Sequence, residues 1–167
     1  MECSIMAHYA LIKNGKVQQV ITGIDEDQTD TLPEGVSSWE EFYGNRHGLT
    51  CKRTSYWTKG NQHWERNAED ELVLSSTQEK ALRGNYAGVG MTYDADNDVF
   101  YLSPDQLQEG WIIDTTDWNA KPPIEMPSLT DEQVADGYFY SWDQVKYQLD
   151  NADPKTQGWV LYQKITE

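Results

Sequence analysis

Short runs of apolar and aromatic residues, separated by turn-forming residues, recur along the whole chain. The first two runs, within 9–21, meet at Asn14-Gly15, a dipeptide that accepts the positive φ angles of a type I′ turn, so they predict a β-hairpin. The same order of strand, polar turn and strand returns further on, in the pairs 89–93 with 99–102, 111–113 with 118, and 138–142 with 159–162. This pattern predicts a mainly β fold made of successive antiparallel hairpins.

Two segments carry helical spacing instead. Ser37 offers an N-cap oxygen with Glu40 three residues further on, and aromatic residues follow at helical spacing before two glycines, which predicts one short helix. Val145 and Leu149 lie four residues apart behind a possible cap at Ser141, which predicts a second. The expected fold is therefore mainly β with one or two short helices.

The chain has 167 residues, a length that favours one domain or two small lobes. We expect an N-terminal lobe over 6–80, with the first hairpin and a short helix, and a hairpin-rich C-terminal lobe over 81–167. The segment 121–127 contains three prolines in seven residues, so it predicts a stiff, extended connector and an alternative boundary. Patterned sequence begins directly after Met6, which makes Met6 a more natural start than Met1.

The composition narrows the function classes. A hydrophobic fraction of 38% and an aromatic fraction of 12% indicate a folded protein. The formal net charge of −15 disfavours direct binding to nucleic acid or to an anionic membrane, because both need Lys and Arg. No apolar run approaches the roughly 20 residues of a membrane-spanning helix. Only two cysteines are present, Cys3 and Cys51, so we expect a reduced, intracellularly made protein.

Charge is distributed unevenly along the chain. The stretch from Asp25 to Glu34 is acidic and is expected to form a solvated loop. The segment 46–66 is mainly basic, whereas 85–120 contains seven acidic residues and no Lys or Arg. We expect these two segments to pair, either within one molecule or between neighbouring copies.

The stretch Asn85-Tyr-Ala-Gly-Val-Gly-Met-Thr-Tyr-Asp94 resembles a motif of small proteins from tailed phages of cyanobacteria and other marine bacteria, Asn-Tyr-Ala-Gly-Ile-Gly-x-x-Tyr-Asp. Weaker similarity extends from Met6 to about Trp159. The resemblance implies an accessory structural protein of the virion, made in the host cytoplasm and incorporated in many copies as a capsid decoration or a tail component. It implies no catalytic residue.

We interpret this motif as a fold signature and not as a ligand site. Gly88 and Gly90 lie two residues apart in an expected strand, which suits a β-bulge or the close approach of another backbone or ring. The motif residues that we single out are Asn85, Tyr86, Gly88, Gly90, Tyr93 and Asp94.

No metal or cofactor is expected. Asp94, Asp96 and Asp98 alternate like the first three ligands of a calcium loop, but Val99 stands where such a loop needs glycine. An acidic hairpin turn is the preferred interpretation, with weak calcium binding as the alternative. The three histidines and Cys51 fit no paired zinc-ligand spacing.

The sequence also lacks a recognisable catalytic constellation. No Ser or Cys lies in a glycine-flanked turn with a plausible His partner, and no glycine-rich phosphate loop is present. We therefore predict a protein that is not an enzyme.

Tryptophan is abundant, with seven residues, and flat aromatic side chains can fill the cores of thin hairpins or anchor interfaces. We expect Trp111, Trp118, Trp142 and Trp159 to fill cores. The interface candidates are Trp57 and Trp64 with the neighbouring basic residues Arg46, Lys52 and Arg53.

The function expected from the sequence is a non-enzymatic virion accessory protein. It would be held against major capsid or tail proteins by strand addition, aromatic anchors and complementary charge. One alternative is a glycan- or receptor-binding module of a phage tail that uses exposed tryptophans and carboxylates. The other is an acidic DNA-mimic inhibitor of a host enzyme, in which carboxylates stand in for phosphates.

Overall fold

The computed structural model describes residues 6–164, so the expectations about Cys3 and about residues 1–5 lie outside the described residues. It confirms the mainly β fold, with twelve strands in antiparallel sheets and three short α-helices in this range. The contacts divide the chain into two compact units. Unit 1 comprises residues 6–106 with Ile113–Ala120, and unit 2 comprises Leu107–Ile112 with residues 121–164.

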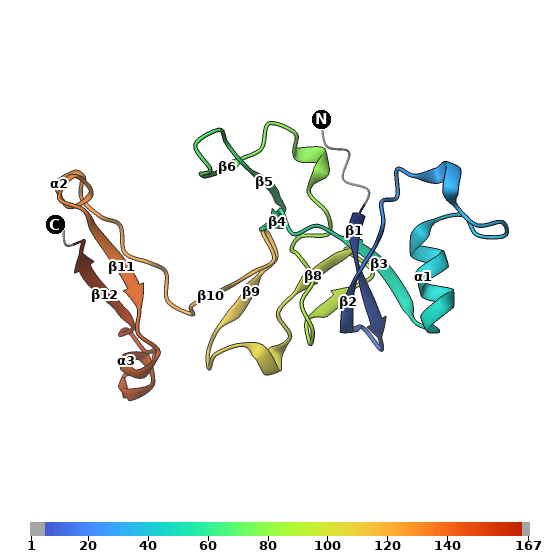
Figure 1. Cartoon of the computed structure of the whole chain (residues 1–167). Helices are drawn as coiled ribbons and strands as arrows, with labels where there is room; N and C mark the ends of the chain where they lie inside the picture. Colours follow the sequence, from blue (N-terminus) through green and yellow to red (C-terminus); the bar gives the residue numbers. More distant parts are fainter. Residues whose placement is uncertain (1–5, 165–167) are drawn as a thin grey trace. The chain divides into compact units, whose positions relative to one another are not determined.

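Unit 1 is built on a five-stranded antiparallel sheet with the strand order β3-β1-β2-β7-β8 (Figure 1). The predicted first hairpin is confirmed, because Asn14 and Gly15 form its two-residue turn with φ angles of 51° and 72°. The strands are β1 (Met6–Lys13), β2 (Lys16–Ile24), β3 (Thr50–Thr54), β7 (Thr92–Asp94) and β8 (Val99–Tyr101).

Strand β1 lies in the middle of the core, because its alternating side chains enter two hydrophobic clusters on opposite faces of the sheet. Tyr9 and Leu11 pack with Trp39 of helix α1 (Trp39–His47), whereas Ile12 packs with Phe100. The helix-side cluster consists of Ala7, Tyr9, Leu11, Trp39 and Cys51. The opposite cluster consists of Ala10, Ile12, Val17, Ala87, Met91, Tyr93 and Phe100.

Helix α1 (Trp39–His47) is the helix expected after the acidic stretch, but its predicted cap is wrong by one residue. Ser38 is the N-cap and its hydroxyl accepts the Glu41 backbone N–H at 3.0 Å. Ser37 lies one residue outside and donates its hydroxyl to the Glu41 carboxylate at 2.6 Å. The later start places the Trp39 side chain in the core as the first helical residue. Gly48 ends the helix with a left-handed φ of 64°.

The remaining strands of unit 1 are shorter than the sequence pattern suggests. The expected strand over 89–93 is wrong in its bounds, because residues 85–91 form a loop and β7 begins only at Thr92. The Val17 backbone holds this loop, accepting the Gly90 N–H and donating to the Met91 carbonyl, both at 2.9 Å. A three-stranded sheet contains β4 (Thr58–Lys59), β5 (Gln62–Arg66) and β6 (Leu72–Leu74), and a separate hairpin contains β9 (Ile112–Asp114) and β10 (Asn119–Lys121).

The division into units differs from the expected lobe boundary near residue 80. Residues 81–106, expected in the C-terminal lobe, belong to unit 1, because β7 pairs with β2 at Lys16 and Thr92. Three short 3-10 helices complete this unit, at Thr29–Thr31, Gln78–Lys80 and Pro104–Gln106.

Unit 2 is built on one antiparallel hairpin, β11 (Tyr138–Trp142) and β12 (Trp159–Gln163). Figure 1 shows α2 (Asp131–Ala135) and α3 (Gln144–Leu149) at opposite ends of this hairpin. The second predicted helix therefore exists, but its cap is Asp143 and not Ser141, because strand β11 continues through Trp142. Leu149 is 72% exposed, so the predicted apolar face of this helix is not buried.

Unit 2 has no buried hydrophobic side chain among its described residues, since all of those in the range 6–164 belong to unit 1. Trp111, Trp142 and Trp159, which we expected in a core, are half-buried. Their indole N–H groups fix them instead: Trp111 and Trp142 both donate to the Gln144 side-chain oxygen, at 3.1 and 2.8 Å, and Trp159 donates to the Ile124 carbonyl at 2.9 Å. Hydrogen bonds and ring contacts therefore hold unit 2 together in place of a dry core.

This contrast predicts different costs for two matched substitutions. Phe100 is 0% exposed, so Phe100→Ala is expected to lower the free energy of unfolding by about 3–5 kcal/mol. Phe139 is 41% exposed, so Phe139→Ala is expected to cost about 1 kcal/mol or less. Urea denaturation followed by circular dichroism measures both, and equal costs would contradict the assignment of the core to unit 1.

Candidate functional site

Two of the basic side chains predicted at an interface are engaged inside unit 1. Both Asp25 carboxylate oxygens accept from one Arg53 guanidinium nitrogen, Nη2, at 2.9 Å, and the Lys52 ammonium lies 3.3 Å from the Glu40 carboxylate. Arg46 is exposed in the last turn of α1. Within one molecule, Lys52 and Arg53 therefore pair with acidic residues that precede them in the chain and not with the segment 85–120.

The acidic stretch beginning at Asp25 is not simply a solvated loop. Besides the Asp25 pair with Arg53, the Glu26 carboxylate accepts the backbone N–H groups of Trp39 and Glu40, at 3.1 and 2.8 Å. N–H groups in the first turn of a helix have no partner within the helix, so Glu26 supplies one. Its negative charge also interacts favourably with the positive end of the helix dipole. Part of the acidic charge therefore serves the fold.

Strand β3, at one edge of the five-stranded sheet, contains an outward residue, Arg53, whose backbone groups are already paired. The Arg53 N–H donates to the Glu40 carboxylate at 2.6 Å, and the Arg53 carbonyl accepts from the Arg83 guanidinium at 2.8 Å. Arg83 also forms ion pairs with Glu40 at 3.0 Å and with Asp98 at 2.7 Å. Side chains thus occupy positions that an added strand would need.

Strand β8, at the opposite edge, is closed in the same way. The Phe100 N–H donates to the Arg83 carbonyl at 2.9 Å, and the Phe100 carbonyl accepts from the Asn85 side chain at 3.0 Å. Asn85 also donates to the Trp118 carbonyl and accepts the Gly60 N–H, both at 3.0 Å. Asn85 therefore joins three segments that are distant in sequence.

The other motif residues also make contacts within unit 1. The ring of Tyr86 packs edge-on against His8, and the Tyr93 hydroxyl donates to Asp98. Gly88 donates its N–H to the Met91 sulfur at 3.0 Å, and Gly90 has a φ of 86° that favours glycine. These contacts support the interpretation of the motif as a fold signature.

Two of the three aspartates weighed as calcium ligands have other contacts, Asp94 and Asp98. Asp94 accepts the backbone N–H groups of Asp96 and Asn97 at 2.9 and 3.1 Å, which forms the turn between β7 and β8. Asp98 is paired with Arg83. Within residues 6–164 no three His, Cys, Asp or Glu side chains are grouped so that they could hold a metal ion.

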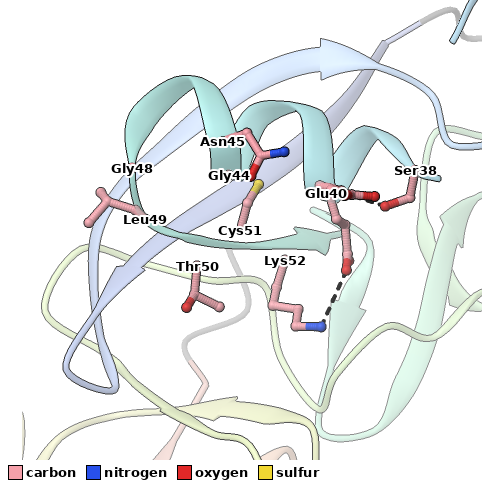
Figure 2. A pocket seen from close by; sticks show the side chains of 10 residues that line it. Ser38, Glu40, Gly44, Asn45, Gly48, Leu49, Thr50, Cys51 and Lys52 are labelled. Carbon is pink, nitrogen blue, oxygen red and sulfur yellow. Dashed lines mark hydrogen bonds and ion pairs between the residues drawn. The ribbon is translucent and has the colours of Figure 1, made fainter. Parts of the chain in front are cut away.

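A polar groove of about 580 Å³ lies between α1 and β3, and Figure 2 shows the side chains that line it. Cys51 is buried, as expected, and its sulfur lies beneath the helix near Gly44, where an added Cβ would come within 2.9 Å of the Leu49 carbonyl. Burial raises the pKa of the Cys51 thiol to about 12, so the thiol stays protonated at neutral pH and is a poor nucleophile. Glu40 and Lys52 neutralise one another across the groove (Figure 2). The groove therefore offers no activated nucleophile.

The two interface tryptophans predicted from the sequence lie in different surroundings. Trp57 is exposed and packs edge-on against Tyr56. Trp64 is half-buried in β5 and its indole N–H reaches the Lys59 carbonyl at 3.4 Å. The structure thus leaves Trp57 accessible, whereas the fold engages Trp64.

The hairpin β11–β12 has open edges in the described chain. Neither strand contains a charged residue or a proline, and neither pairs with a third strand within residues 6–164. Phe139 and Tyr162 face one another across the hairpin with their rings stacked, at a centroid distance of 5.8 Å and an interplanar angle of 27°. They are 41% and 48% exposed. Sequence reasoning identified these strands but missed this stacked pair, which only the cross-strand register reveals.

None of the helices described here is long and apolar enough to cross a bilayer. Comparison with protein-family models, with curated proteins and with solved structures gave no match. The functional conclusion therefore depends on the geometry of this chain and on the motif resemblance.

One buried histidine makes the stability of unit 1 sensitive to pH. His63 lies in β5, is buried, and its Nδ1 atom has no hydrogen-bond partner in the described chain. Burial lowers the pKa of His63 below its ordinary value, and the nearby Lys80 adds to this effect. His63 therefore stays neutral in the folded state at pH values where the unfolded chain already takes up a proton.

We expect the free energy of unfolding to fall as the pH drops below about 6.5, because only the unfolded state then gains the proton readily. The variant His63→Gln removes this titration and is expected to flatten the profile between about pH 5 and 6.5. Urea denaturation across this range measures both proteins. Parallel profiles would contradict the role of His63.

Proposed function

We propose that this protein is a non-enzymatic accessory structural protein of a phage virion, attached to capsid or tail proteins through the hairpin β11–β12. The observation that carries the proposal is that this hairpin is uncharged, is open at both edges and exposes a stacked aromatic pair. The resemblance of the segment 85–94 to small virion proteins of marine phages gives the expected location. Synthesis in the host cytoplasm and incorporation in many copies belong to the same proposal.

The physical argument starts from the weakness of an isolated hairpin. Two strands alone are marginally stable in water and gain stability when a third strand or another surface covers them. Proteins usually protect exposed edges with charged residues, prolines or covering segments. Strands β11 and β12 contain neither charge nor proline, whereas side chains close the edges of the larger sheet in unit 1.

A strand from a neighbouring virion protein would satisfy these edges. It would pair with the open backbone groups of β11 or β12, and the partner's side chains would cover Phe139 and Tyr162. Aromatic residues in such positions often carry much of the binding energy of an interface. Attachment of this kind needs no catalytic group.

The DNA-mimic alternative receives less support from the geometry. A mimic needs carboxylates that are free and arranged in a row, as phosphates are. Asp25, Glu26 and Glu40 are instead bound to partners within unit 1. We therefore keep the virion protein as the proposal.

Quantitative mass spectrometry of gradient-purified virions, beside the soluble lysate, tests the proposed location. We expect enrichment in virions, with a ratio to the major capsid protein near one for a shell component and of a few per cent for a tail component. Absence from virions together with abundance in the lysate would overturn the proposal.

Variants in the encoding phage test the proposed surface. Phe139→Lys and Tyr162→Lys place a charge on the exposed face of the hairpin, and each is expected to reduce incorporation about tenfold or more. Leu149→Lys is the matched control, because Leu149 is an exposed apolar residue of α3 in the same unit. Equal incorporation of all three variants would contradict attachment through the hairpin.

A further inference from the structure

A second groove, of about 380 Å³, lies on unit 1 and has a different character from the groove beside α1. Tyr56, Tyr86 and Trp118 supply its aromatic walls, and Lys59 and Asn119 supply polar groups. Its other lining residues are apolar or neutral, so Lys59 is the only charged residue in it, although the whole chain has a net charge of −15. No carboxylate of the described chain thus lines this groove, although the protein as a whole is acidic.

The tryptophans in and beside this groove differ from the others in the hydrogen bonding of their indole N–H groups. Five of the seven tryptophans donate their indole N–H to an oxygen of the protein: Trp39, Trp64, Trp111, Trp142 and Trp159. Trp57 and Trp118 have no such acceptor within residues 6–164. Trp118 lines the groove and Trp57 adjoins it through Tyr56. Trp118 therefore lines the groove with an indole whose N–H has no acceptor in the described chain.

Other polar groups of the groove are also unused by the fold. The Tyr86 hydroxyl, the Tyr56 hydroxyl and the Lys59 ammonium have no hydrogen-bond partner among the described residues. Tyr56 is 65% exposed, although its ring is in edge contact with Tyr86 at a centroid distance of 5.6 Å. Covering the exposed face of the Tyr56 ring with an apolar ligand surface is favourable, and the polar groups around it can exchange their water for ligand hydroxyls.

The aromatic walls are held in place before any ligand arrives. Trp118 stacks on Tyr101 with a centroid distance of 5.5 Å and an interplanar angle of 23°. Its backbone is fixed at both ends, since its N–H donates to the Asp114 carbonyl at 2.7 Å and its carbonyl accepts from Asn85 at 3.0 Å. Such preorganisation lowers the entropic cost of binding.

The geometry points to a carbohydrate site, in which one pyranose ring occupies the groove. A pyranose has a flat face of C–H groups, which suits the rings of Tyr56 and Trp118, and hydroxyls around its rim, which suit Lys59, Tyr86 and Asn119. The groove volume lies within the range of about 300–1,000 Å³ that is typical of small-molecule sites. A phosphate-rich ligand fits less well, because the rest of the chain is acidic and only one lysine is present in the groove.

Titrations observed by ¹H–¹⁵N NMR test this inference on the isolated full chain. The probes are maltohexaose, cellohexaose, chitohexaose and an oligogalacturonate, each at millimolar concentration. We expect at least one of them to shift the Trp118 indole N–H resonance, while the indole signals of Trp111, Trp142 and Trp159 in unit 2 stay in place. No shift with any of the four probes would overturn the proposal.

Substitutions then locate the binding. Tyr56→Ala and Lys59→Ala remove exposed side chains of the groove and are expected to raise the dissociation constant of the binding probe about tenfold or more. Leu74→Ala is the control, because Leu74 is an exposed apolar residue of unit 1 that does not line the groove. Binding that persists in Tyr56→Ala would overturn the site, whether or not the protein is found in virions.

Discussion

The segment from Arg83 to Ala87 bridges the two edge strands of the main sheet, and the rest of unit 1 depends on this bridge. Arg83 binds the backbone of β3 with its guanidinium and the backbone of β8 with its own carbonyl. Ala87 donates its N–H to the Thr54 hydroxyl of β3 at 2.9 Å, and Asn85 reaches β8 and the Trp118 carbonyl. Because buried backbone groups must be paired, this one segment supplies partners to both edge strands at once.

The edge strands of the main sheet in unit 1 are paired with side chains and loop backbone, whereas the edges of the hairpin in unit 2 are unpaired within the described residues. A protein that closes the edges of one sheet with ion pairs and amide groups, yet leaves the uncharged hairpin β11–β12 open, presents that hairpin as a region suited to strand addition. The absence of a buried hydrophobic residue among the described residues of unit 2 agrees with this view, since the surface that a partner would cover includes Phe139 and Tyr162. The aromatic groove of unit 1 is a separate surface with a different chemistry.

The features that could be predicted from the sequence are those that neighbouring residues determine. The Asn14-Gly15 hairpin, the mainly β fold and the existence of a helix near Trp39 follow from turn chemistry and residue spacing, and the structure confirms them. Prediction from the sequence failed for side chains whose partners lie far away along the chain. Glu26 caps a helix that begins 13 residues later, and Arg53 pairs with Asp25 across 28 positions, so no local pattern distinguishes them from solvated charge.

In the candidate sites, too, local structure could be predicted from the sequence but long-range contacts could not. The strands β11 and β12 could be predicted, but the stacking of Phe139 on Tyr162 depends on the cross-strand register. Trp64 and Trp118 both differ from expectation, because the Trp64 indole donates to the Lys59 carbonyl, whereas Trp118 is half-buried and lines a groove. No spacing in the sequence signals either outcome.

The most direct measurement of the central claim is amide hydrogen exchange in β11 and β12, compared between the free protein and purified virions. The account predicts rapid exchange of the outward amides of at least one of these strands in the free protein, and strong protection of the same amides in virions. The Phe100 amide, which is already paired with the Arg83 carbonyl, is expected to be protected in both. Unchanged exchange in the hairpin on incorporation would contradict attachment by strand addition.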